Sequence, residues 1–175
     1  MTTHDETVAP RTDPETDLLL GHLRAQRQHV LGIVEGLDEE ALRRPVLPSG
    51  WSIAGLLNHL AHDDERFWFQ AVVAGDPDAI AETEAGDSSA WQVSKEVSGQ
   101  SVVDRYRAEI GRSDDIIAAA LLDDEPRWWP VFFGEWRMNS LREVLLHVIT
   151  ETACHAGHLD AAREIIDGRQ WMVLD

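Results

Sequence analysis

The sequence has 175 residues, 43% of them hydrophobic, with 15 Lys or Arg against 32 Asp or Glu and a formal net charge of −17 at pH 7. Such acidity disfavours nucleic acid and anionic lipid as partners, and no apolar run approaches the roughly 20 residues of a membrane-spanning helix. The single Cys excludes an internal disulfide, and the acidic amino end lacks the basic and apolar regions of a signal peptide. We therefore expect a cytoplasmic protein in which residues 13–175 form one domain.

The first half of the chain predicts two long helices. Residues 1–12 are polar and aperiodic, as is typical of a flexible tail. Apolar positions at helical spacing predict a helix over 13–35, which opens with an Asp-Pro pair suited to a helix start. A short helical turn is expected over 38–44, before a proline. A second long helix is expected over 52–73.

The second half predicts two more helices. Residues 76–98 are expected to form a long surface loop, with or without a short helix. A third helix is expected over 101–125, and an aromatic-rich extended or irregular segment over 126–139. A Ser and a Glu in capping-box spacing open a fourth helix over 140–168. The sequence thus predicts an all-α fold, a four-helix bundle with long connections and an irregular aromatic-rich segment before the last helix.

The last expected helix carries two polar groups at or beside its apolar stripe. The stripe steps by four and three residues through Leu141, Leu145, Val148, Thr152, His155, Leu159, Ala162 and Ile166. His155 stands where a leucine is expected, and Glu151 lies one turn earlier on its flank. A carboxylate drawn toward an apolar interior must be paired, protonated or metal-bound. We therefore expect a cationic group near both side chains.

The second long helix offers a partner for these two residues. His59 lies next to the apolar stripe of that helix, whereas His62 is flanked by charged residues and is expected on the surface. Asp63 follows His59 by one turn and could orient its imidazole. His59, Glu151 and His155 would supply two nitrogens and one oxygen to a metal, and would leave a coordination position open, as catalytic zinc sites do.

Structural interpretations of the same residues stay open. His155 could be a core histidine hydrogen-bonded to Glu151. His147 is expected beside the ligands or in a structural role, and His158 at the rim of the pocket. Cys154 could be a nucleophile with His158 four residues on, although a buried inert thiol is the simpler interpretation.

Aromatic and acidic clusters also allow two interpretations. Trp68, Trp128 and Trp129 are expected to be core anchors or walls of a ligand pocket. The acidic runs 63–65 and 123–125 are expected to be solvated flanks and ends of helices.

Two segments in this order, "SGWSIAGLLNHLAHDDERFW" and "LREVLLHVITETACHAGHLDAAREIIDG", resemble the DinB-like superfamily of metal-binding four-helix bundles. The resemblance covers about residues 15–170 and is closest to the actinobacterial branch that includes mycothiol-dependent maleylpyruvate isomerase, whose triad is His, Glu, His. It implies His59, Glu151 and His155 as ligands of a divalent metal, zinc first, with Ni²⁺, Fe²⁺ or Mn²⁺ also accepted. His158 stands where the wider superfamily commonly has Gln.

The resemblance also implies thiol chemistry. Members are thought to use mycothiol, bacillithiol or glutathione, so a metal-held thiolate attacking an electrophilic small molecule is the expected reaction, in a possible homodimer. The 175 residues contain no counterpart of the isomerase's additional carboxy-terminal domain, so the isomerase's own substrate is not expected. Metal-assisted hydrolysis and a non-catalytic, metal-stabilised binding or stress-response bundle remain alternatives.

Overall fold

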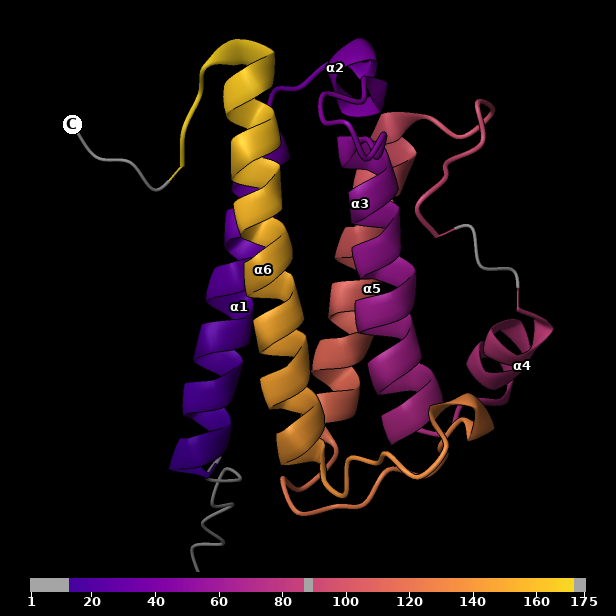
Figure 1. Ribbon diagram of the computed structural model, residues 1–175. Helices are drawn as coiled ribbons and strands as arrows, with labels where there is room; N and C mark the ends of the chain where they lie inside the picture. The colour runs from indigo at the N-terminus through magenta and orange to yellow at the C-terminus, as the bar shows by residue number, and fades with distance from the viewer. Residues whose placement is uncertain (1–12, 87–89, 172–175) are drawn as a thin grey trace, which may run out of the picture.

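The computed structural model describes residues 13–86 and 90–171, and the regular secondary structure of these residues is helical, without a strand. The tail expected over 1–12 lies outside the described residues. Four long rods form the body of the molecule (Figure 1): α1 (Pro14–Val34), α3 (Ile53–His59) continued by η1 (Leu60–Val73), α5 (Gly99–Ala118) and α6 (Leu141–Asp167). Three short helices lie in the connections: α2 (Glu39–Arg43), α4 (Pro77–Ala85) and η2 (Val131–Phe133). The predicted all-α bundle is thereby confirmed. Among the described helices, none has the length and apolarity that crossing a membrane requires.

The ends of α6 follow from local sequence signals. The Ser140 hydroxyl accepts a hydrogen bond from the backbone N–H of Glu143 at 3.3 Å, and the Glu143 carboxylate accepts one from the N–H of Asn139 at 2.9 Å. Gly168, with φ at 78°, ends the helix in the left-handed conformation that glycine adopts without strain. Both ends of this helix therefore lie within a residue of the predicted ones.

The third predicted helix ends earlier than expected. The sequence pattern favoured 101–125, whereas α5 starts at Gly99 and ends at Ala118. The irregular residues that follow supply acceptors to the start of α6, where the carbonyl of Asp124 accepts a hydrogen bond from the N–H of Leu141 at 2.9 Å. The first N–H groups of a helix have no partner within that helix, so this turn satisfies donors that a longer α5 would leave open.

The second long rod changes its winding along its length. α3 is an α-helix, whereas η1 is a π-helix, in which residue i bonds to residue i−5. The pattern is visible at its end, where the N–H of Ala74 donates to the carbonyl of Phe69 at 2.9 Å. Because each turn of a π-helix contains more residues than a turn of an α-helix, the side chain of residue i+5 lies closer to that of residue i than it does in an α-helix. Asp64 therefore comes to the same side as His59.

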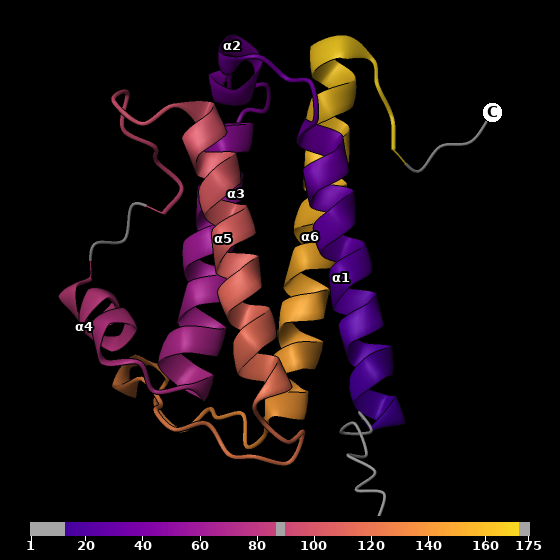
Figure 2. The same ribbon diagram turned by 180° about the vertical axis from the view of Figure 1, so that it is seen from behind.

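The rods associate as two pairs. α1 packs on α6 and α5 packs on η1, and Figures 1 and 2 show both pairs from opposite sides. Arg27 of α1 joins the pairs, because its guanidinium contacts the Glu65 carboxylate of η1 through Nε–Oε1 at 2.7 Å and Nη2–Oε2 at 2.6 Å. Glu65 is 0% exposed, so the expectation that the run 63–65 is a solvated flank is wrong for this residue.

Candidate active site

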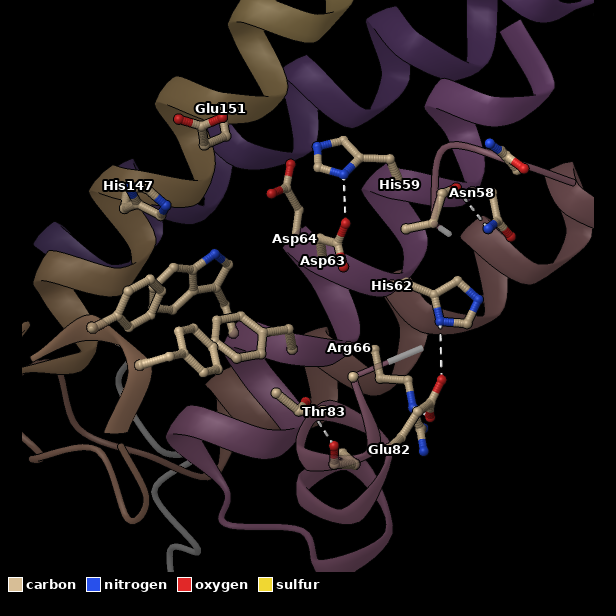
Figure 3. A pocket seen from close by; sticks show the side chains of 18 residues that line it. Asn58, His59, His62, Asp63, Asp64, Arg66, Glu82, Thr83, His147 and Glu151 are labelled. Carbon is tan, nitrogen blue, oxygen red and sulfur yellow. Dashed lines mark hydrogen bonds and ion pairs between the residues drawn. The ribbon is translucent and has the colours of Figure 1, made fainter. Parts of the chain in front are cut away.

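A cavity of about 680 Å³ opens between η1, α4, α6 and the segment around η2 (Figure 3). Helix α6 contributes His147 and Glu151 to its lining, and the α3–η1 rod contributes His59, Asp63 and Asp64 among others. Residues from widely separated parts of the chain therefore face one space, which is the usual form of a small-molecule site.

His59 is held from two sides. Its Nδ1 lies 2.6 Å from Oδ2 of Asp63, and its ring stacks on the indole of Trp91 with centroids 4.3 Å apart and planes inclined by 19°. A carboxylate only accepts hydrogen bonds, so the proton of this contact is on Nδ1. The contact with Asp63 thus fixes the orientation of the imidazole, as the spacing of the two residues predicts.

His155 approaches His59 from the opposite helix. The two rings meet edge to face, with centroids 4.9 Å apart, and Nε2 of His155 is 3.7 Å from Oε2 of Glu151. Burial lowers the pKa of His155 to about 4, with a further contribution from His59, while Glu151 acts in the opposite direction. His155 is therefore a neutral imidazole at physiological pH, with a lone pair available.

Asp64 is a site residue that the sequence interpretation missed. It is 4% exposed, and its Oδ2 atom is buried without a hydrogen-bond partner. Burial raises the pKa of this carboxyl well above the usual range, and the nearby charges of Glu151, Glu65 and Asp63 add to the effect. Figure 3 shows the Asp64 carboxylate between His59 and Glu151. An α-helical wheel puts residue 64 far from residue 59, and only the π winding of η1 brings the two together.

The types of ligand atom at this site suit a divalent metal, although the atoms are not arranged around a single point. Within residues 13–86 and 90–171, no three His, Cys, Asp or Glu side chains stand in a metal-holding arrangement. The imidazoles of His59 and His155 and the carboxylate of Glu151 nevertheless lie together, and nitrogen with carboxylate ligands suits zinc. A bound ion would have to draw these side chains closer to one another.

The other predicted site residues are placed in different ways. His147 lines the cavity with its ring 4.7 Å from that of Trp68, and burial lowers its pKa. His158 is exposed, and its Nδ1 lies 3.5 Å from Nδ1 of His155. Cys154 is also exposed, which corrects the expectation of a buried thiol.

Of the three tryptophans considered as pocket walls, only one touches the cavity. Trp68 lines it, whereas Trp128 and Trp129 do not. Trp129 packs behind Trp68 with centroids 6.0 Å apart, and Trp128 lies 6.5 Å from the ring of Phe67. These two rings support the wall from behind.

The sequence interpretation also missed the polar side of the cavity. His62, expected on the surface, lines the cavity with Nδ1 3.2 Å from Oε1 of Glu82, and Arg66 Nε donates to Oε2 of Glu82 at 2.7 Å. Glu82 belongs to α4, a short helix of the kind that the sequence left open within the expected surface loop. The signal for this helix was present, because Asp76 caps it and Pro77 follows in the first turn.

Comparison with known proteins identifies a family whose model matches this chain. A family model described as Mycothiol-S-transferase matches residues 18–168, a range that contains all the site residues described above. No curated protein matches the chain.

Proposed function

Because the chain belongs to the mycothiol-S-transferase family, we propose that it joins a low-molecular-weight thiol, mycothiol or a close analogue, through its sulfur to an electrophilic small molecule. The reaction would take place in the cavity between η1 and α6, where the polar and aromatic lining residues provide space for both reactants.

The approach of His59 to His155 is the observation that carries this proposal. The two rings lie 4.9 Å apart on helices far apart in the sequence, and Glu151 and the partnerless Asp64 oxygen lie beside them. We propose that His59, Glu151 and His155 hold a divalent metal, zinc in the first place, with Ni²⁺, Fe²⁺ or Mn²⁺ as further ions that this ligand set accepts. When bound, such an ion lowers the pKa of a coordinating thiol and holds it as a thiolate.

The surrounding residues prepare this site. Asp63 orients His59 through the contact at 2.6 Å, and burial keeps His155 unprotonated, so that His155 retains a lone pair. In the metal-free protein, the raised pKa of Asp64 keeps this carboxyl protonated under conditions in which a surface aspartate is ionised.

The proposed transfer forms one sulfur–carbon bond. The sulfur electron pair attacks an electrophilic carbon, and the leaving group departs with the electrons of its own bond. The proton of the thiol goes to a base, for which the neutral imidazole of His147 in the cavity lining is suited. For addition to a double bond, the same proton is returned to the neighbouring carbon, so that no other reactant is needed.

The test combines metal analysis with a conjugation assay. We expect the purified protein to contain one divalent ion per chain, and His59→Ala to abolish metal binding and reduce conjugation of a model electrophile by roughly 100-fold or more. His22→Ala is the matched control, because this histidine is exposed on α1 and outside the cavity. Normal turnover by His59→Ala would refute the assignment.

The same assay separates the alternative functions. Product formation without added thiol would indicate metal-assisted hydrolysis, because only the transfer needs a thiol. A lower melting temperature after chelation, with no turnover under either condition, would indicate a metal-stabilised protein without catalysis.

A further inference from the structure

The cavity has two chemically different ends. Figure 3 shows His147 on one side of Glu151 and Asp64, and His62 with Glu82 on the opposite side. The ring of Trp68 lies edge-on to His147 at 4.7 Å, so the aromatic residues belong to the first of these sides. We call them the aromatic end and the polar end, and His59 and Glu151 lie between them.

The aromatic end is built from flat side chains in parallel and perpendicular contact. The rings of Trp68 and Phe133 are inclined by only 4° with centroids 5.8 Å apart, and Phe67 lies edge-on to Trp68 at 4.7 Å. Phe132 stacks on Phe67 at 6.3 Å, yet 64% of its surface is exposed beside the cavity. An exposed aromatic ring next to a stacked group offers a planar ligand a face to cover.

This wall is held in place before any ligand binds. The backbone N–H of Trp128 donates to the carbonyl of Val72 at 3.2 Å, which attaches the aromatic segment to the end of η1. The Trp129 indole N–H donates to the carbonyl of Trp136 at 3.0 Å, which closes the segment on itself. A preformed wall binds a rigid planar molecule with a small loss of conformational freedom.

The charges of the cavity limit the choice further. Within the described part of its lining, four carboxyl groups, those of Asp63, Asp64, Glu82 and Glu151, stand beside one guanidinium, that of Arg66. Arg66 is already paired with Glu82 at 2.7 Å. At the aromatic end, a carboxylate on the reactant would be buried against the rings of Phe132, Phe133 and Trp68 without a charged partner, which is costly.

We propose, on the basis of the function proposed above, that the electrophile is an uncharged planar apolar molecule, aromatic or conjugated, bound against Phe132, Phe133 and Trp68. The hydroxyl-bearing part of the thiol then occupies the polar end. There, the imidazole of His62, the hydroxyl of Thr83 and the carboxylate of Glu82 offer hydrogen-bond donors and acceptors.

The experiment uses three electrophiles with the purified metal-loaded protein. 1-Chloro-2,4-dinitrobenzene is planar and uncharged, 4-chloro-3,5-dinitrobenzoate adds a carboxylate to the same ring, and iodoacetamide has no ring. We expect the uncharged arene to have the highest kcat/KM relative to its uncatalysed rate with the thiol, and the benzoate to be at least about 10-fold worse. Equal enhancement of the two arenes would overturn the charge argument.

Two sets of variants test which end binds which reactant. Phe132→Ala and Phe133→Leu should raise KM for the uncharged arene about 3- to 10-fold, with KM for the thiol and the rate with iodoacetamide changed less than about twofold. Thr83→Val and His62→Phe should raise KM for the thiol instead. If either set of variants raised KM for the arene and KM for the thiol by the same factor, the assignment of the two ends would be overturned.

A binding measurement makes the result independent of turnover. 1,3-Dinitrobenzene has no leaving group, so its binding can be followed by quenching of tryptophan fluorescence in the metal-free and metal-loaded protein. We expect saturable binding that Phe133→Leu weakens and His62→Phe does not, and the absence of saturable binding would overturn the proposal. Binding without any thiol transfer would contradict the proposed function alone, whereas transfer without preference for the uncharged arene would contradict this inference alone.

Discussion

The imidazole of His59 lies face to face with the indole of Trp91, and the same indole meets the ring of His155 at 5.7 Å. One side chain from a connecting segment therefore covers both candidate nitrogen ligands. Gly55 makes this approach possible, because a Cβ atom at this position would lie 2.3 Å from the carbonyl oxygen of Trp91. Asn58 adds a second attachment, donating from Nδ2 to the carbonyl of Ala90 at 2.8 Å.

Gly55→Ala should displace the segment that carries Trp91. The added methyl group meets backbone rather than a flexible side chain, so we expect a loss of about 1–3 kcal/mol in the free energy of unfolding and a changed near-ultraviolet circular dichroism spectrum. Gly21→Ala is the control, because nothing lies within 4 Å of a Cβ there and alanine favours the helix by up to about 1 kcal/mol. Equal effects of the two substitutions would contradict the close-approach explanation.

Asp64→Asn should stabilise the metal-free protein at alkaline pH. Burial raises the pKa of Asp64 in the folded state above its unfolded value, so the stability that its neutral form contributes is present at low pH and is lost as the pH rises through the folded pKa. Asparagine stays neutral throughout. Urea denaturation should therefore give the variant a higher free energy of unfolding than the unsubstituted protein at pH 8, with the difference decreasing toward pH 4. A difference that does not change with pH would argue against a titrating Asp64.

His155 should make the metal-free protein less stable under mildly acidic conditions. Its folded pKa of about 4 lies below the unfolded value of 6.5, so the unfolded state binds a proton more readily. The corresponding stability is complete above about pH 6.5 and is lost as the pH falls toward 4. In His155→Leu this part of the pH profile should flatten, which urea denaturation at a series of pH values would measure; an unchanged slope would contradict the assignment.

Breaking the ion pair between α1 and η1 should be costly without altering the site directly. Arg27→Met leaves the carboxylate of Glu65 buried and unpaired, for which we expect a loss of about 3–5 kcal/mol in the free energy of unfolding. Combining it with Glu65→Leu should recover much of that loss, because the lone buried charge is removed. Arg107→Ala, which breaks an exposed pair with Asp104, serves as control and should cost less than about 1 kcal/mol. A double variant as unstable as Arg27→Met would show that the pair itself is indispensable.

Several features of the site could be predicted from sequence because they are local. Glu151 and His155 are one turn apart on one helix, and His59 and Asp63 are one turn apart on another, so their relative placement depends on helix geometry alone. The same holds for the start of α6, where Ser140 caps the helix within four residues. The family resemblance in these segments agrees with the matched family.

The errors fall where the geometry depends on segments far apart in the chain. Asp64 and Glu65 were expected to be solvated as part of an acidic run, whereas both are buried, and the burial of Glu65 depends on its contact with Arg27 of α1. Likewise, α5 ends at Ala118 because the following residues hydrogen-bond to the start of α6, a contact that the local apolar pattern does not contain.

The sequence by itself determined the long helices and the apolar stripe of α6, because side-chain spacing along one helix is a property of a short stretch of chain. The family resemblance added the combination of His59 with Glu151 and His155 as candidate ligands. Only the tertiary structure decided that Trp91 covers the imidazoles, that Asp64 joins them, and that one end of the cavity is aromatic and the other polar. Those relationships join distant segments, and their geometry is set by close packing in the folded molecule, where each side chain must fit its neighbours.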